Sequence, residues 1–108
     1  MSIKTEILTG RDSGQMKTEI MFFIAAAKSV GRELFKLEVN PVFSEEREVR
    51  RVESIARILR NLKQRGIIQL FASSSDFNTS ITEIEYLRNK YPNITEIEED
   101  GMFFVVKL

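Results

Sequence analysis

A polar cluster at residues 72–80, ASSSDFNTS, holds the side chains of this chain that are best suited to chemistry. Six of its nine residues are Ser, Asn or Thr. Hydroxyl and amide groups can cradle a phosphate, and the cluster lies between a strand-like apolar run and a predicted helix, where α/β proteins often bind anions. The candidate ligand-binding residues are Ser73, Ser74, Ser75, Asp76, Asn78, Thr79 and Ser80.

The same cluster can instead serve only the local backbone. Ser80 and Glu83 have the S-x-x-E spacing of a capping box, and Asp76 or Asn78 can close an Asx turn. The cluster also lacks glycine, which phosphate-binding loops use to bring the backbone close to the ligand. We therefore favour a helix cap and turn over a small anionic ligand, and we expect no cofactor.

A second candidate is the basic helix predicted over residues 45–65. Residues 45–66 carry seven Arg and Lys residues against four Glu. The stretch RILRNLKQRGIIQLF resembles the last helix and the following strand of winged-helix DNA-binding proteins. The helix has no internal turn and follows a predicted strand, so a solvated face with ion pairs is the favoured interpretation. In the alternative, nucleic acid would be contacted by Arg50, Arg57, Arg60 and Lys63.

Acidic residues near the C-terminus form a third pattern. Glu96, Glu98, Glu99 and Asp100 carry the oxygen ligands that Mg²⁺ and Ca²⁺ prefer, but their spacing is not that of an EF-hand. A polar strand edge and turn is the favoured interpretation, so no metal is expected. The chain has neither His nor Cys, which removes imidazole bases, thiolate nucleophiles and disulfides. We expect no enzymatic activity.

The composition indicates one folded domain over residues 1–108. Apolar residues make up 43% and charged residues 30%, and 16 basic side chains balance 16 acidic ones. A net charge of zero gives no reason to expect nucleic acid or an anionic membrane as a partner. The apolar run at residues 21–27 is far shorter than the roughly 20 residues that span a membrane, and the N-terminus has no secretory signal. We expect a cytoplasmic protein with no membrane partner.

Alternating strands and helices must position these candidates. Residues 34–39 alternate in polarity as a strand does, and residues 44–66 carry an apolar stripe at helical spacing. The run at residues 16–30 suits a helix that ends at Gly31, but an internal strand suits it equally well. The predicted order is β-α-β-α-β-α-β-β, with strands at 3–8, 34–39, 67–72, 94–98 and 102–108 and helices at 16–30, 44–66 and 80–92. This order predicts an α/β or α+β sandwich with a C-terminal antiparallel hairpin and parallel pairing among the earlier strands where they are neighbours.

Two apolar segments predict contact with another protein. A helix at residues 16–30 would be apolar all round and would need cover on both sides. The strand at residues 102–108 is apolar on both faces, and at the margin of a sheet it would need a second chain to cover it. The predicted interface residues are Met21, Phe22, Phe104 and Val106. The resulting hypothesis is a small interaction or regulatory domain that forms a homo-oligomer, most simply a dimer.

Overall fold

The computed structural model describes residues 3–39, 45–78, 82–91 and 102–108, without the side chains of Glu45, Phe77, Asn78 and Glu83. The elements are, in chain order, β1 (Thr5–Leu8), α1 (Ser13–Ser29), β2 (Leu34–Val39), α2 (Glu45–Gln64), β3 (Leu70–Ser73), a 3-10 helix η1 (Ser74–Asn78), α3 (Thr82–Lys90) and β4 (Phe103–Lys107). The predicted α+β class is confirmed, and the order agrees roughly. The strand predicted at 94–98 lies outside the described residues. The predicted C-terminal hairpin is wrong, because β4 pairs with β2 on one side and with β3 on the other.

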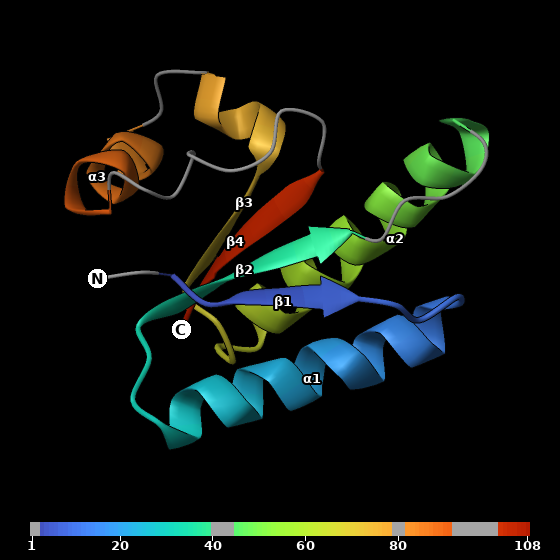
Figure 1. Cartoon of the computed structure of the whole chain (residues 1–108), viewed down its shortest axis with the longest axis horizontal. Coiled ribbons are helices and arrows are strands. Elements are labelled where there is room, and N and C mark those ends of the chain that lie inside the picture. The colour runs from blue at the N-terminus through green and yellow to red at the C-terminus, as the bar shows by residue number, and fades with distance from the viewer. Residues whose placement is uncertain (1–2, 40–44, 79–81, 92–101) are drawn as a thin grey trace.

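The four strands form one sheet in the order β1-β2-β4-β3 (Figure 1). β1 and β2 are parallel neighbours joined by α1, as predicted. β4 runs antiparallel to β2 on one side and to β3 on the other. The strand that comes last in the sequence therefore lies inside the sheet, and β1 lies at one edge.

Helices pack on both faces of the sheet. α1 and α2 lie on one face and contact each other, whereas α3 lies on the opposite face (Figure 1). Because strand side chains alternate between faces, β2, β3 and β4 contribute to two separate cores, whereas β1 contributes Leu8 to one of them. The larger core, under α1 and α2, includes Ile20, Ile24, Phe35, Leu37, Ile55, Leu59, Phe104 and Val106. The smaller core, under α3, contains Leu34, Ala72, Ile84, Leu87, Phe103 and Val105.

α1 is helical throughout, which decides between the two interpretations of residues 16–30. The helix begins at Ser13 rather than Met16 because Asp12 caps it: Oδ1 of Asp12 accepts a hydrogen bond of 2.8 Å from the N–H of Gln15. At the other end, Gly31 adopts a φ of 73°, and the N–H of Arg32 donates to the carbonyl of Ala27 at 3.0 Å. The predicted stop at Gly31 is thus confirmed.

The end of α2 sets the start of β3. Gly66 adopts a φ of 74°, and the N–H of Ile67 donates to the carbonyl of Leu62 at 3.0 Å, which closes the last turn. Ile68 is then buried in the larger core before the strand begins. The strand predicted at residues 67–72 therefore starts only at Leu70, and its last residue, Ser73, is the first serine of the polar cluster.

The prediction that Phe104 and Val106 form an interface is wrong. Their exposed fractions are 1% and 0%, because β4 lies between β2 and β3 rather than at the margin of the sheet. A strand that is apolar on both faces belongs in the interior of a covered sheet. The other two predicted interface residues differ from this pair, since Met21 is half-buried and Phe22 is 68% exposed.

Replacing Phe104 tests the central position of β4. We expect Phe104→Ala to lower the free energy of unfolding by about 3–5 kcal/mol, because it removes a large buried side chain and leaves a cavity. Tyr86→Ala, at a side chain that is 54% exposed on α3, should change it by no more than about 0.5 kcal/mol. Denaturant unfolding of the two variants measures both effects. Equal losses would contradict the burial of β4.

Candidate functional site at the loop between β1 and α1

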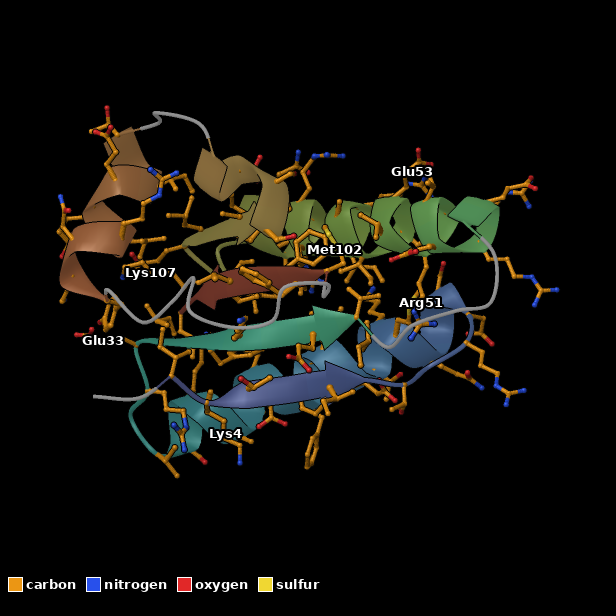
Figure 2. The ribbon with its side chains drawn as sticks, turned by 45° about the horizontal axis from the view of Figure 1, so that its top comes forward. Lys4, Glu33, Arg51, Glu53, Met102 and Lys107 are labelled. Carbon is orange, nitrogen blue, oxygen red and sulfur yellow. The ribbon has the colours of Figure 1, made fainter. Side chains whose placement is uncertain are left out.

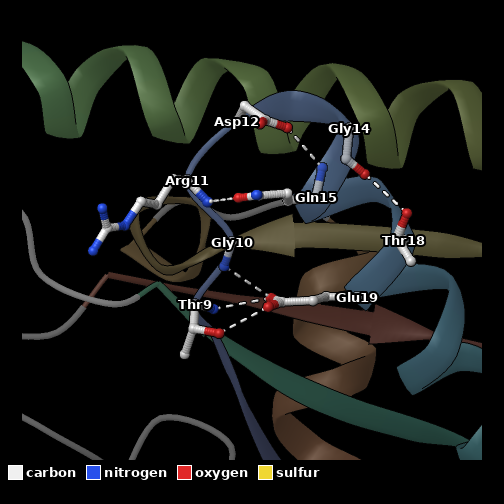
Figure 3. Close-up of a pocket in the computed structure, with 8 residues that line it drawn as sticks. All are labelled: Thr9, Gly10, Arg11, Asp12, Gly14, Gln15, Thr18 and Glu19. Carbon is white, nitrogen blue, oxygen red and sulfur yellow. Dashed lines mark hydrogen bonds between the residues drawn. The ribbon is translucent and has the colours of Figure 1, made fainter.

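The loop between β1 and α1 occupies the position where α/β proteins most often bind ligands. It follows the C-terminal end of a parallel strand and leads into the N-terminus of a helix. No candidate site was predicted from the sequence in this segment, TGRDSG at residues 9–14. The loop and the first turns of α1 form an open depression (Figure 3) lined by Thr9, Gly10, Arg11, Asp12, Gly14, Gln15, Thr18 and Glu19.

Glu19 reaches back from α1 and holds the loop by three hydrogen bonds. Its carboxylate accepts from the N–H of Thr9 at 2.9 Å, from the hydroxyl of Thr9 at 2.7 Å and from the N–H of Gly10 at 3.1 Å (Figure 3). Hydrogen bonds to an ionised carboxylate are stronger than those between neutral groups. One side chain thus orders the chain directly after β1.

These contacts favour the ionised form of Glu19. Partial burial by itself raises the pKa of Glu19, because it disfavours the charged form. The hydroxyl of Thr9, the two N–H groups and the positive charge of Arg51 outweigh that effect and lower the pKa below its ordinary value of 4.5. The carboxylate is therefore charged at neutral pH.

Arg51 holds the same loop from the side of α2. Its guanidinium donates to the carbonyl of Leu8 at 3.0 Å and to the carbonyl of Gly10. The side chain is only 9% exposed, and Figure 2 shows it between α2 and the C-terminal end of β1. Because guanidinium stays protonated in proteins, a permanent positive charge lies against these two carbonyls.

Gly10 is needed where the loop meets α1. A Cβ atom at this position would lie 2.9 Å from the backbone nitrogen of Met16 and 3.0 Å from atoms of Gln15. Only a residue without a side chain allows the loop to approach the first turn of α1 so closely. The close approach brings the N–H of Gly10 within reach of Glu19.

The backbone donors of the loop are largely used by the protein itself. Glu19 takes the N–H groups of Thr9 and Gly10, and the side-chain oxygen of Gln15 accepts from the N–H of Arg11 at 2.8 Å. The carboxylates of Asp12 and Glu19 also line the depression and would repel an anion. The arrangement suits the ordering of β1 and α1 better than the binding of a phosphate.

The polar cluster at residues 72–80 is partly described. The carboxylate of Asp76 accepts from the N–H of Ser73 at 2.7 Å and from its hydroxyl at 3.0 Å, as in an Asx-type turn. The hydroxyl of Ser75 lies 2.9 Å from that of Ser73, and the hydroxyl of Ser74 donates to the sulfur of Met102. Thr79, Ser80 and the side chain of Asn78 lie outside the described part, so the ligand and the cap at Ser80 stay predictions.

The basic residues of α2 are distributed over its surface. Arg50, Arg57, Arg60 and Lys63 are exposed, and Arg50 forms an ion pair of 2.8 Å with Glu46, one turn earlier. Contact with nucleic acid stays a prediction. The acidic residues at 96–100 lie outside the described part of the chain.

A second surface, which sequence reasoning identified only at Phe22, lies where α1 runs beside β1. Phe23 and Ala26 of α1 line a groove with Glu6 of β1. The groove is also lined by Val30 and Arg32, which follow α1, and by Lys4, which precedes β1. Val30 is 66% exposed, and the ring of Phe22 lies edge-on to that of Phe23, with 6.2 Å between centroids. Figure 2 shows Lys4 beside α1, away from α3. We call this surface the β1–α1 edge and define it as Lys4, Glu6, Phe22, Phe23, Ala26 and Val30.

No family model matches this sequence, and comparisons with curated proteins and with solved structures find no match either. Within the described ranges, no group of three or more acidic side chains could hold a metal ion. None of the helices in that part of the chain is long and apolar enough to cross a membrane. Function therefore has to be inferred from the surfaces of the protein itself.

Arg51 should be far more important to stability than its neighbour Arg50. We expect Arg51→Met to lower the free energy of unfolding by about 2–4 kcal/mol, because two carbonyls lose a charged donor. Arg50→Met removes only an exposed ion pair within α2 and should cost no more than about 0.5 kcal/mol. Denaturant unfolding at neutral pH compares them. Equal effects would show that the contacts of Arg51 do not hold the loop.

The lowered pKa of Glu19 predicts a pH-dependent contribution to stability. A carboxylate with a pKa below 4.5 in the folded state stabilises the fold fully above that pH, and the contribution is lost as pH falls through the lowered pKa. Glu19→Gln should therefore destabilise the protein by about 1 kcal/mol at neutral pH, with a difference that disappears in acid. Thermal melts across this pH range measure it, with Glu85→Gln on α3 as the control. A difference that does not change with pH would contradict the role of the charge.

Proposed function

We propose that the protein is a non-enzymatic interaction module that forms a homodimer through the β1–α1 edge. The observation that carries the proposal is a strand edge that no other described strand pairs with, beside a strip of exposed apolar side chains. Phe22 is 68% exposed and Val30 66%, and Ile7 on the other face of β1 is 54% exposed. Charges such as Lys4 and Glu6 are one device that keeps a strand edge unpaired, but monomeric proteins also avoid grouping apolar side chains beside such an edge.

The solvent face of α1 suits contact with an identical surface. The exposed Lys17 and Lys28 lie on the other side of α1 and the exposed Arg32 lines the groove after its end, but the residues exposed on the same side as Phe22 are uncharged. Most of them are also small, which allows two helices to approach closely. These residues are Gly14, Gln15, Thr18, Ala25, Ala26 and Ser29.

α1 alone offers too little area for a stable dimer. A helix of 17 residues is about 25 Å long, and a strip about 10 Å wide along it covers roughly 250 Å². A standard interface buries roughly 800 Å² on each partner. The open edge of β1 is the adjoining surface that can add both area and backbone hydrogen bonds.

The two alternative functions have less support. The exposed Arg50 of α2 is paired with Glu46, which lowers the charge available to a nucleic-acid phosphate. In the polar cluster, the carboxylate of Asp76 already accepts hydrogen bonds from the N–H and the hydroxyl of Ser73. The negative charge of that carboxylate also disfavours an anion there.

A charge placed in the apolar strip should weaken the dimer. We expect Phe22→Asp to raise the dissociation constant at least tenfold, because the burial of a Phe side chain is worth about 1.5–3 kcal/mol and the new carboxylate must lose water. Sedimentation equilibrium over a range of protein concentrations measures the dissociation constant.

The control is Tyr86→Asp, which places the same charge at an exposed aromatic on the opposite face of the sheet. It should leave the dissociation constant unchanged. A wild-type protein with the mass of a single chain at the highest concentration would refute the proposed dimer, and equal weakening by both variants would refute the interface.

A further inference from the structure

We infer that two copies of the chain pair through β1 in one register, antiparallel about Thr5, so that Lys4 of each copy faces Glu6 of the other. The inference rests on the proposed dimer and specifies how its two halves recognise each other. It depends on three features of β1: the direction of its backbone groups, the position of its charges and the symmetry of its sequence.

The backbone groups that point away from the sheet belong to the odd-numbered residues of β1. The N–H of Lys36 in β2 donates to the carbonyl of Lys4 at 2.9 Å, so the backbone groups of Lys4 face β2. Because these groups alternate in direction along a strand, those of Glu6 also face β2, whereas those of Thr5 and Ile7 point outward. No described strand pairs with β1 on that side.

Outward-pointing groups restrict how a second β1 can pair. In a symmetric antiparallel pair, the outward-pointing groups of one β1 must meet those of the other, so odd-numbered residues lie opposite odd-numbered residues. The two-fold axis can then pass beside Lys4, Thr5 or Glu6, and that residue lies opposite its own copy. An axis at Lys4 brings two lysines together, and an axis at Glu6 brings two glutamates together. Like charges directly opposite each other destabilise a pair of strands, and unlike charges stabilise it. An axis at Thr5 alone places each Lys4 opposite the partner copy's Glu6.

The remaining residues fit the same axis. In the sequence Ile-Lys-Thr-Glu-Ile at residues 3–7, Thr5 is flanked on each side by a charged residue and then by Ile. The two flanking charges have opposite signs. Thr5 therefore meets Thr5 of the partner copy, and Ile7, which is 54% exposed, meets the partner copy's Ile3. Cross-strand pairs of β-branched residues stabilise a sheet. The pairing covers an apolar side chain that the isolated chain leaves in water.

Replacing the ionic contact between Lys4 and Glu6 within one chain by contacts between two chains costs little free energy. In the single chain, Nζ of Lys4 lies 3.5 Å from a carboxylate oxygen of Glu6, with 51% of the lysine side chain exposed. An exposed pair of this kind contributes little to stability. An axis perpendicular to the sheet also puts both copies of α1 on the same face, where the grooves along Phe23, Ala26 and Val30 meet.

Exchanging the charges tests the register. Lys4→Glu alone places glutamate opposite glutamate, and Glu6→Lys alone places lysine opposite lysine, so each variant should dimerise at least tenfold more weakly than wild type. An equimolar mixture of the two should form a heterodimer with near wild-type affinity. The double variant, with both changes in one chain, should dimerise with itself again. Native mass spectrometry with one variant isotope-labelled separates homodimers from heterodimers, and circular dichroism checks that each variant is folded.

The outcomes separate this inference from the proposed function. A monomeric wild type would overturn both. A wild-type dimer that is unaffected by either single change, or a mixture that shows no preference for the heterodimer, would overturn the register while leaving the dimer in place.

Cross-linking gives an independent measurement, because the chain contains no Cys. In the inferred register the two Thr5 Cα atoms lie about 5.5 Å apart, within the range of a disulfide. Thr5→Cys should therefore form a covalent dimer on mild oxidation. Ile7→Cys is the matched control, because its two copies lie four residues apart, roughly 13 Å, and should not cross-link. Cross-linking at Ile7 and not at Thr5 would overturn the register.

Discussion

The position of β1 depends on Arg51. β1 has four residues and, among the described strands, pairs only with β2, so few of the described hydrogen bonds hold it in the sheet. Arg51 crosses from α2 to the carbonyls of Leu8 and Gly10, and Glu19 holds the N–H groups that follow. Two opposite charges thereby fix the end of the strand and the start of α1. These contacts hold the end of β1 from the inside of the fold, and none of the described strands pairs with its outer side.

The elements with clear local signals could be predicted from the sequence. β2 has its predicted bounds, and α2 and the stops at Gly31 and Gly66 follow from an apolar stripe and from glycine with positive φ. The start of α1 was placed too late because the apolar run begins at Met16. The D-x-x-Q capping signal at Asp12 and Gln15 was present but lies before that run.

The strand order and the loop contacts could not be predicted in the same way. The residues of β4 are apolar on both faces, which indicates a core strand, but nothing local shows that Phe104 lies between Leu37 of β2 and Ser73 of β3. In the sequence, Arg51 cannot be told from the five other basic residues of α2 by residue type alone. Its distinguishing signal is its place on the buried stripe, four residues before Ile55 and eight before Leu59. The symmetry of residues 3–7 suggests pairing with a second copy only when β1 is known to be an edge strand.

The central position of β4 also affects how the protein is made. During synthesis, β2 and β3 leave the ribosome long before residues 103–107, so the nascent chain carries two strands whose shared neighbour does not yet exist. Their apolar side chains and unpaired backbone groups resemble those of an aggregation-prone folding intermediate. The larger core lacks Phe104 and Val106 until that point. The sheet and the larger core can therefore be completed only after residues 103–107 have left the ribosome.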